Sequence, residues 1–235
     1  MEQSALRCLY ALNSITLHKI QGMTIAVLAN ETLRKAWEQK GYPADVELLW
    51  CGSVRSFVAT VADAYIDLEF TADPERTQLL KQREHFPLFI NAPQYSCKNL
   101  GVDFIRMNAW PGFFERDLVE LVAITEERNL QAARVMEALQ WKWIGVKDIE
   151  GMIAARVIAT IINEAYHTEA AGISSRQDID TAMKLGTGYP FGPFEWARKI
   201  GIENVYELLR VLHTQSKIYE PSAALKLEMD QLNKS

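Results

Sequence analysis

Residues Ile179–Trp196 read IDTAMKLGTGYPFGPFEW, and this stretch decides the fold of the chain around it. Its first half has the composition of a helix, whereas glycines, prolines and aromatic residues crowd into its second half. The pattern predicts a helix that ends at Gly186, a sharply turned apolar loop, and a second helix that begins near Pro193. Proline suits the first turn of a helix because its missing N–H has no partner there in any case.

Helical periodicity surrounds this stretch from Thr125 to the end of the chain. Ser174 and Ser175 are a plausible N-cap signal for the helix that carries Asp180 to Leu185. Further helices are predicted over residues 126–140, 152–171, 203–213 and 223–233. The last part of the chain is therefore expected to be all-helical.

The earlier part of the chain alternates between strand and helix patterns. Strands are predicted over residues 24–29, 46–50, 64–70, 88–90, 104–107 and 118–124, with helices over 31–40 and 74–84. This alternation is typical of a parallel, doubly wound sheet. The expected fold class is α/β plus all-α, with a lead-in over residues 1–22, a shortened Rossmann-like domain over 23–146 and a helical domain over 147–235.

Composition excludes several classes of partner. The net charge is −5 and the isoelectric point is about 5.5, so no basic face for nucleic acid or an anionic membrane is expected. The longest apolar run, Met152–Ile162, is broken by Arg156 and is too short for a membrane span. Cys8, Cys51 and Cys97 lack the spacing of a metal site, which favours a reducing compartment. With no visible secretory signal, a cytoplasmic location is expected.

The turn after the first predicted strand is where a dinucleotide would bind in a sheet of this kind. That site needs glycines, so that backbone N–H groups can approach the diphosphate. Residues Leu28–Leu33 contain no glycine, and Glu31 brings a negative charge to the start of the helix. The second strand is followed by Cys51 and Gly52, with no acid to hold a ribose hydroxyl. The residues themselves therefore assign no cofactor.

Two long strings carry a resemblance to a known family. Asp178–Gly186 and Gly188–Pro190 resemble the C-terminal domain of the 3-hydroxyacyl-CoA dehydrogenases, and residues 104–122 resemble the strand, loop and strand that hold their catalytic dyad. The resemblance implies NAD as cofactor, an acyl-CoA-like ligand and a homodimer formed through the helical domain. It is weak before residue 60, where the first domain is also shorter than in the family.

Four positions of this chain correspond to residues of the family's site, and three of them are substituted while one is retained. The family's dyad histidine is replaced by Asn108, and Glu120 matches its glutamate. An amide cannot accept a proton at neutral pH, so Asn108 can only hydrogen-bond a substrate oxygen. The family's substrate-contacting serine and asparagine correspond to Gln94 and Ala155. The resemblance thus places candidate catalytic positions at Asn108 and Glu120, and substituted substrate positions at Gln94 and Ala155.

Structural explanations compete with each of these functional ones. Glu120 could instead pair with Arg106 or Arg116 on a neighbouring segment. The aromatic residues expected near the crevice could line an acyl-binding surface or pack in the cores and between the domains; they are Trp110, Phe113, Phe114, Trp141, Trp143 and Trp196. The histidines, which are His18, His85, His167 and His213, suit surface or structural positions better than that of a catalytic base.

Three hypotheses follow. The first is a dimeric scaffold of the 3-hydroxyacyl-CoA dehydrogenase family that lacks NAD-dependent dehydrogenase activity and binds an acyl-CoA-like ligand. The second is an active NAD-dependent enzyme in which Asn108 and Glu120 polarise the substrate. The third is a purely structural or interaction protein, without a pocket near these two residues.

Overall fold

The computed structural model describes residues 22–232, so Cys8, His18 and all but the last residue of the predicted lead-in lie outside the described residues. The elements of the first part are β1 Met23–Leu28, α1 Glu31–Lys40, β2 Val46–Cys51, α2 Val54–Ala59, β3 Ala64–Asp67, α3 Pro74–Leu80, β4 Leu88–Asn91, α4 Cys97–Leu100, β5 Ile105–Met107, β6 Leu118–Val122, α5 Glu126–Leu139 and β7 Lys142–Gly145. The helices of the second part are α6 Ala154–Ala170, α7 Arg176–Thr187, α8 Pro193–Ile200, α9 Ile202–His213 and α10 Ala223–Leu232.

The strands form one sheet in the order β2-β1-β3-β4-β5-β6-β7. All neighbouring pairs are parallel except β5 and β6, so the expected parallel sheet needs one correction. Only the loop of residues 108–117 joins these two strands, and it holds no crossover helix. Strands joined in this way pair antiparallel, because a parallel pair needs a longer crossover connection.

Both faces of the sheet are covered, as a doubly wound fold requires. Ile25 and Val27 of β1 point into a core shared with α1 and α5, whereas Ala26 and Leu28 point into a core shared with α2 and α3. This follows from the two-residue period of a strand, which sends alternate side chains to opposite faces. Strands buried on both faces are accordingly mostly apolar, and in β1 only Thr24 is polar.

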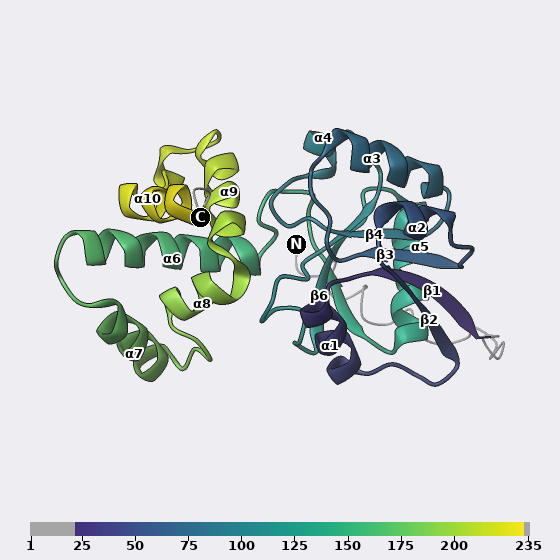
Figure 1. Cartoon of the computed structure of the whole chain (residues 1–235), viewed down its shortest axis with the longest axis horizontal. Helices are drawn as coiled ribbons and strands as arrows, with labels where there is room; N and C mark the ends of the chain where they lie inside the picture. The colour runs from purple at the N-terminus through teal and green to yellow at the C-terminus, as the bar shows by residue number, and fades with distance from the viewer. Residues whose placement is uncertain (1–21, 233–235) are drawn as a thin grey trace, which may run out of the picture.

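The helical part lies beside the sheet, and the long α6 runs through it (Figure 1). Its core is built from α6, α8, α9 and one residue of α10, and it also receives Trp110 and Phe113 from the loop between β5 and β6. This loop therefore connects two strands of the sheet and also contributes side chains to the core of the helical part. None of the helices within residues 22–232 is long and apolar enough to cross a membrane.

The stretch that decides the fold forms the end of α7, a loop and the start of α8. The predicted restart at Pro193 is confirmed, with Gly192 as N-cap. The predicted end at Gly186 is wrong by one residue, because α7 continues to Thr187 and Gly188 closes it in the left-handed region at φ 70°. Gly192 has a packing reason to be glycine, since a Cβ there would lie 2.4 Å from the Cα of Asp180.

Several short elements were not predicted, namely α2, α4 and β7. Packing between the domains was one alternative for Trp141, which lies just before β7. It lies instead in the core of the sheet, where its ring is 4.6 Å from Trp37 and its Nε1 donates to the carbonyl of Gly41 at 2.9 Å.

Candidate functional site

The positions of the expected dyad are brought together by the antiparallel pairing of β5 and β6. The backbone N–H of Asn108 donates to the carbonyl of Glu120 at 3.2 Å. Asn108 is only 3% exposed, and its Oδ1 accepts the backbone N–H of Trp110 at 3.3 Å. The side chain of Asn108 thus closes a local turn, as asparagine commonly does in loops.

Glu120 has a different partner from those expected at the sequence level. Its two carboxylate oxygens accept the backbone N–H groups of Ile153 at 3.3 Å and Ala154 at 3.0 Å. These amides begin α6, so Glu120 caps that helix at its positive end. The predicted pairing with Arg106 or Arg116 is wrong: Arg106 pairs with Asp148, and neither arginine pairs with Glu120 among the described residues.

The two substituted substrate positions lie in different surroundings. Ala155 is fully buried in the first turn of α6 and packs in the helical core, where it lines none of the cavities described below. Gln94 lies in the loop after β4, and its Nε2 donates to Oδ1 of Asn204 on α9 at 2.8 Å. The next residue, Tyr95, donates its hydroxyl to Glu207 of the same helix at 2.6 Å. This loop therefore ties the sheet to the helical part.

Arg106 anchors the same junction from inside. Its guanidinium is fully buried, with Nη1 2.5 Å from Asp148 and Nε 3.0 Å from the carbonyl of Ala92. Burial lowers the pKa of Arg106, and the carboxylate of Asp148 acts in the opposite direction. Asp148 also accepts the backbone N–H of Cys97 at 2.9 Å. The loop after β4 and the segment leading into α6 are thus held by one buried ion pair.

A polar pocket of about 380 Å³ lies at the carboxyl ends of the strands. It is lined by Asn30, Thr32, Leu33, Leu68, Glu69, Phe70, Thr71, Asn91, Gln94, Trp110, Pro111, Ile200 and Asn204. Because β2 and β3 lie on opposite sides of β1, the connections reverse direction between β1 and β3. Open α/β sheets bind ligands at such a switch point.

The turn at this switch point does not fit the diphosphate of a dinucleotide. Asn30 caps α1, and its Oδ1 takes up the backbone N–H of Leu33 at 2.9 Å, one of the groups that would face a phosphate. Glu31 was expected to be the acid that opposes a phosphate here. It points away to an ion pair with Lys35, and the acid that lines the pocket is Glu69.

A second, largely apolar pocket of about 260 Å³ lies between the loop after β5, the start of α6 and the loop before α8. Its lining consists of Phe113, Arg116, Ile153, Ala154, Val157, Ile158, Tyr189, Pro190 and Trp196. The rings of Phe113 and Trp196 stack at 4.9 Å, and the guanidinium of Arg116 lies 4.4 Å from the centroid of Phe113. The capping contacts of Glu120 with Ile153 and Ala154 place this pocket beside the dyad positions.

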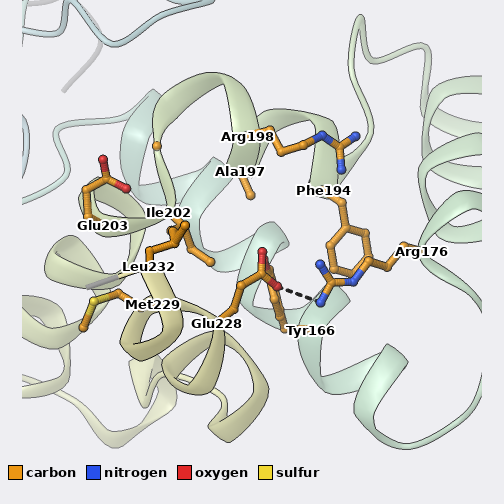
Figure 2. A pocket seen from close by; sticks show the side chains of 11 residues that line it. Tyr166, Arg176, Phe194, Ala197, Arg198, Ile202, Glu203, Glu228, Met229 and Leu232 are labelled. Atoms are coloured by element: carbon orange, nitrogen blue, oxygen red, sulfur yellow. Dashed lines mark ion pairs between the residues drawn. The ribbon is translucent and has the colours of Figure 1, made fainter. Parts of the chain in front are cut away.

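A third cavity, of about 620 Å³, lies within the helical part (Figure 2). Arg176 pairs there with Glu228 at 2.7 Å and with Glu169 at 2.7 Å, and lies over the rings of Tyr166 and Phe194. Burial and the nearby Glu228 raise the pKa of Tyr166. The arginine is thus fully engaged by the protein's own acids, and no residue of the expected site reaches this cavity.

The remaining predictions have mixed outcomes. Five of the six aromatic residues expected at the crevice are buried in a core, and Trp143 is partly buried against one. Trp110, Phe113 and Trp196 also line a pocket.

Within residues 22–232 no group of three or more histidine, cysteine or acidic side chains could hold a metal ion. Sequence reasoning missed Glu69, Arg116 and Asn204 as lining residues, and Asn204 has no local signal that could have identified it.

Known proteins are similar in sequence to the helical part of this chain. A family model described as "3-hydroxyacyl-CoA dehydrogenase, C-terminal domain" matches residues 151–234. The chain is 41% identical over 83 residues to the 3-hydroxyadipyl-CoA dehydrogenase of Escherichia coli, and 36% identical over 114 residues to the mitochondrial hydroxyacyl-coenzyme A dehydrogenase of Sus scrofa. These matches cover 34% and 46% of this chain, but only 18% and 36% of the two relatives, well under half their length.

The fold likeness extends over nearly the whole chain. The crystal structure of (S)-3-hydroxybutyryl-CoA dehydrogenase PaaH1 from Ralstonia eutropha aligns with a TM-score of 0.70 at 18% identity, and the alignment covers 89% of this chain and 94% of that one. A Rossmann-like sheet followed by a helical domain is therefore the shared fold. The matches therefore identify residues 151–234 as a domain of the 3-hydroxyacyl-CoA dehydrogenase C-terminal family, and the chain as a whole shares the fold of these enzymes.

Proposed function

We propose that this chain does not catalyse NAD-dependent oxidation of a 3-hydroxyacyl-CoA, and that it has kept the family's fold as a dimeric scaffold that binds an acyl-CoA-like ligand. The side chain of Asn108 carries the first half of the proposal. An amide has no proton-accepting group at neutral pH, and this one is buried and bonded to the turn that it closes. The partner that would orient a base, Glu120, is engaged by α6.

The apolar pocket supports the ligand half of the proposal. Its floor is formed by side chains of the kind that bury an acyl chain, among them Val157 and Ile158 of α6. Arg116 is the only charged residue in its lining, and it has no ion-pair partner among the described residues. An apolar tail joined to an anionic group, such as a fatty acyl thioester of coenzyme A, suits this combination of surface and charge.

Enzymatic assay and calorimetry test the two halves separately. We expect no oxidation above background when the purified chain is mixed with 3-hydroxybutyryl-CoA and NAD. We also expect heat of binding from butyryl-CoA and none from NAD. Measurable oxidation would instead support an active enzyme with a remodelled site, and no binding of any acyl-CoA would support a purely structural protein.

One pair of variants on α6 sharpens the binding test. Val157 is half exposed and lines the apolar pocket, so Val157→Glu places a charge where the acyl chain would lie. Thr160→Glu makes the same change on an exposed position of α6 outside this lining. Butyryl-CoA affinity should fall at least about tenfold in the first variant, and stay within about twofold in the second.

A homodimer formed through the helical part belongs to the same proposal. Large apolar side chains stand exposed there, including Leu185 at 84%, Ile173 at 73% and Leu227 at 60%. Exposed apolar side chains gathered on one part of a protein are typical of an association surface. Sedimentation equilibrium at micromolar concentration should give twice the chain mass, and a monomer would contradict the assembly.

The free, buried thiols of Cys51 and Cys97 favour a reducing compartment, so we propose a cytoplasmic location.

A further inference from the structure

The two pockets beside the loop of residues 108–117 carry charges of opposite sign. The apolar pocket has Arg116 as its one charged residue, whereas the polar pocket at the switch point has Glu69 and no lysine, arginine or histidine in its lining. We propose that the polar pocket binds a small organic ammonium cation, a ligand distinct from the acyl-CoA-like one. The inference does not depend on the apolar pocket or on the absence of dehydrogenase activity.

Glu69 is held in place but left unpaired. Asp67 is fully buried at the end of β3, and its Oδ1 accepts the backbone N–H of Glu69 at 3.0 Å. The charge of Asp67 is matched by Arg76, which donates to it from Nε and Nη2 at 2.7–3.0 Å. The carboxylate of Glu69 itself is half-buried and has no hydrogen-bond or ion-pair partner among the described residues. Its negative charge is therefore available to a ligand.

A free acceptor lies in this pocket besides the carboxylate of Glu69. Gln94 donates from its Nε2 to Asn204, so its Oε1 remains as an acceptor. Asn91 donates to the carbonyl of Leu68 at 3.1 Å and accepts the backbone N–H of Ala109 at 2.9 Å, which uses its amide on both sides. A hydroxyl on the ligand can therefore donate to Oε1 of Gln94.

Two aromatic side chains, Phe70 and Trp110, complete the lining around Glu69. The face of an aromatic ring attracts a cation, and aromatic rings together with a carboxylate are the groups that recognise ammonium ligands. A volume of about 380 Å³ is within the range of small-molecule sites. Charge and aromatic surface therefore favour the same class of ligand, and the carboxylate of Glu69 opposes a phosphate.

A pair of probes of equal shape isolates the charge. Choline and 3,3-dimethylbutan-1-ol differ only in having nitrogen or carbon at the branched centre, so a difference in their binding measures the attraction for the cation. We expect choline to bind the full chain at least about tenfold more tightly in titrations followed by NMR. The preference should weaken as salt rises, because screening reduces it.

Substitution of Glu69 tests where that preference arises. Glu69→Gln keeps the shape of the side chain and should bring the two probes to within about twofold of each other, and Glu69→Ala should do the same. Glu137→Gln removes an equal charge from an exposed position on α5 and should leave the preference unchanged. Thermal melting before titration establishes that each variant is folded.

Several results would overturn the inference. They are equal binding of the two probes by the unchanged protein, no binding of choline at millimolar concentration, or a choline preference that survives both Glu69 substitutions. None of these outcomes bears on the proposed absence of 3-hydroxyacyl-CoA oxidation, which the enzymatic assay decides by itself.

Discussion

Oε1 of Glu120 accepts the backbone N–H of Ala154 at 3.0 Å, so the acid predicted as half of a catalytic dyad caps α6. The same carboxylate reaches the N–H of Ile153 at 3.3 Å. Because Ile153 itself supplies no side-chain cap, Glu120 satisfies donors that would otherwise have no partner. The contact also joins β6 of the sheet to the helix that forms the helical core.

Loss of this cap should reduce stability. We expect Glu120→Ala to lower the free energy of unfolding by about 1–2 kcal/mol, since a charged acceptor at a helix N-terminus contributes about that much. Chemical denaturation followed by circular dichroism measures the change. Glu137→Gln, which alters an exposed acid that caps no helix, should unfold like the unchanged protein. Equal stability of Glu120→Ala and the unchanged protein would show that the cap contributes nothing.

Restoring the family's base should not restore its chemistry. We expect Asn108→His to remain without NAD-dependent oxidation of 3-hydroxybutyryl-CoA. The new imidazole would find Glu120 bonded to α6, and the turn at Asn30 would still not accept a diphosphate. Spectrophotometric assay of NADH formation checks this. A rate that appears only in Asn108→His would show that the histidine was the one missing component.

The pH dependence of stability should report on a contact near the stretch that decides the fold. Glu195 of α8 accepts from Nζ of Lys184 on α7 at 2.5 Å and from the backbone N–H of Gly192 at 2.9 Å. The hydrogen bond from Lys184 holds the pKa of Glu195 below its usual 4.5. A lowered carboxyl pKa stabilises the folded state above pH 4.5, and this contribution disappears as the pH falls through the lower, folded-state pKa.

Glu195→Gln removes that proton linkage. Its melting temperature should therefore be lower than that of the unchanged protein at pH 7, and the gap should narrow as the pH falls below 4.5. Melting curves recorded across this range for both proteins provide the test. A gap that stays constant with pH would mean that the charge of Glu195 has no part in stabilising the fold.

Much of the fold could be predicted because its long elements have a strong period. Apolar spacing and flanking residues alone predict a strand over residues 24–29, which is observed as Met23–Leu28, and the helix Glu31–Lys40. Helices α2 and α4 span six and four residues, too short for a period to appear. The antiparallel pairing of β5 and β6 was missed for a different reason: the loop of residues 108–117 is too short for a parallel crossover, but the alternation of strands and helices elsewhere favours a parallel sheet.

The candidate site was predictable only where its residues are close in the chain. Asn108 directly follows β5 and Glu120 lies on the adjacent strand β6, so their meeting follows from a local motif. Gln94 meets Asn204 from more than a hundred residues away, and only the packing of α9 on the sheet brings them together. The negative charge of the polar pocket comes from Glu69, which lies just after β3. The sequence of the turn between β1 and α1 alone therefore could not predict this charge.

Two glycines in the stretch of residues 179–196 have opposite environments and provide a matched pair. A Cβ on Gly192 would lie 2.4 Å from the Cα and Oδ1 of Asp180, whose Oδ1 also accepts the backbone N–H of Phe194 at 2.8 Å. Neither backbone nor a bonded carboxylate can yield cheaply, so Gly192→Ala should cost about 2–4 kcal/mol of unfolding free energy.

Gly186 lies within α7, and a Cβ there would meet nothing within 4 Å. Alanine is the better helix former, so Gly186→Ala should stabilise the protein by about 0.5–1 kcal/mol. Urea denaturation of the two variants and the unchanged protein shows directly whether each substitution raises or lowers the free energy of unfolding. If both substitutions destabilise the protein equally, the close approach of Asp180 to Gly192 cannot be the reason for glycine at residue 192. Destabilisation by Gly192→Ala together with stabilisation by Gly186→Ala would show that the packing of α7 against α8 requires glycine at residue 192. Gly186 would then be a helical position where glycine is tolerated but not required.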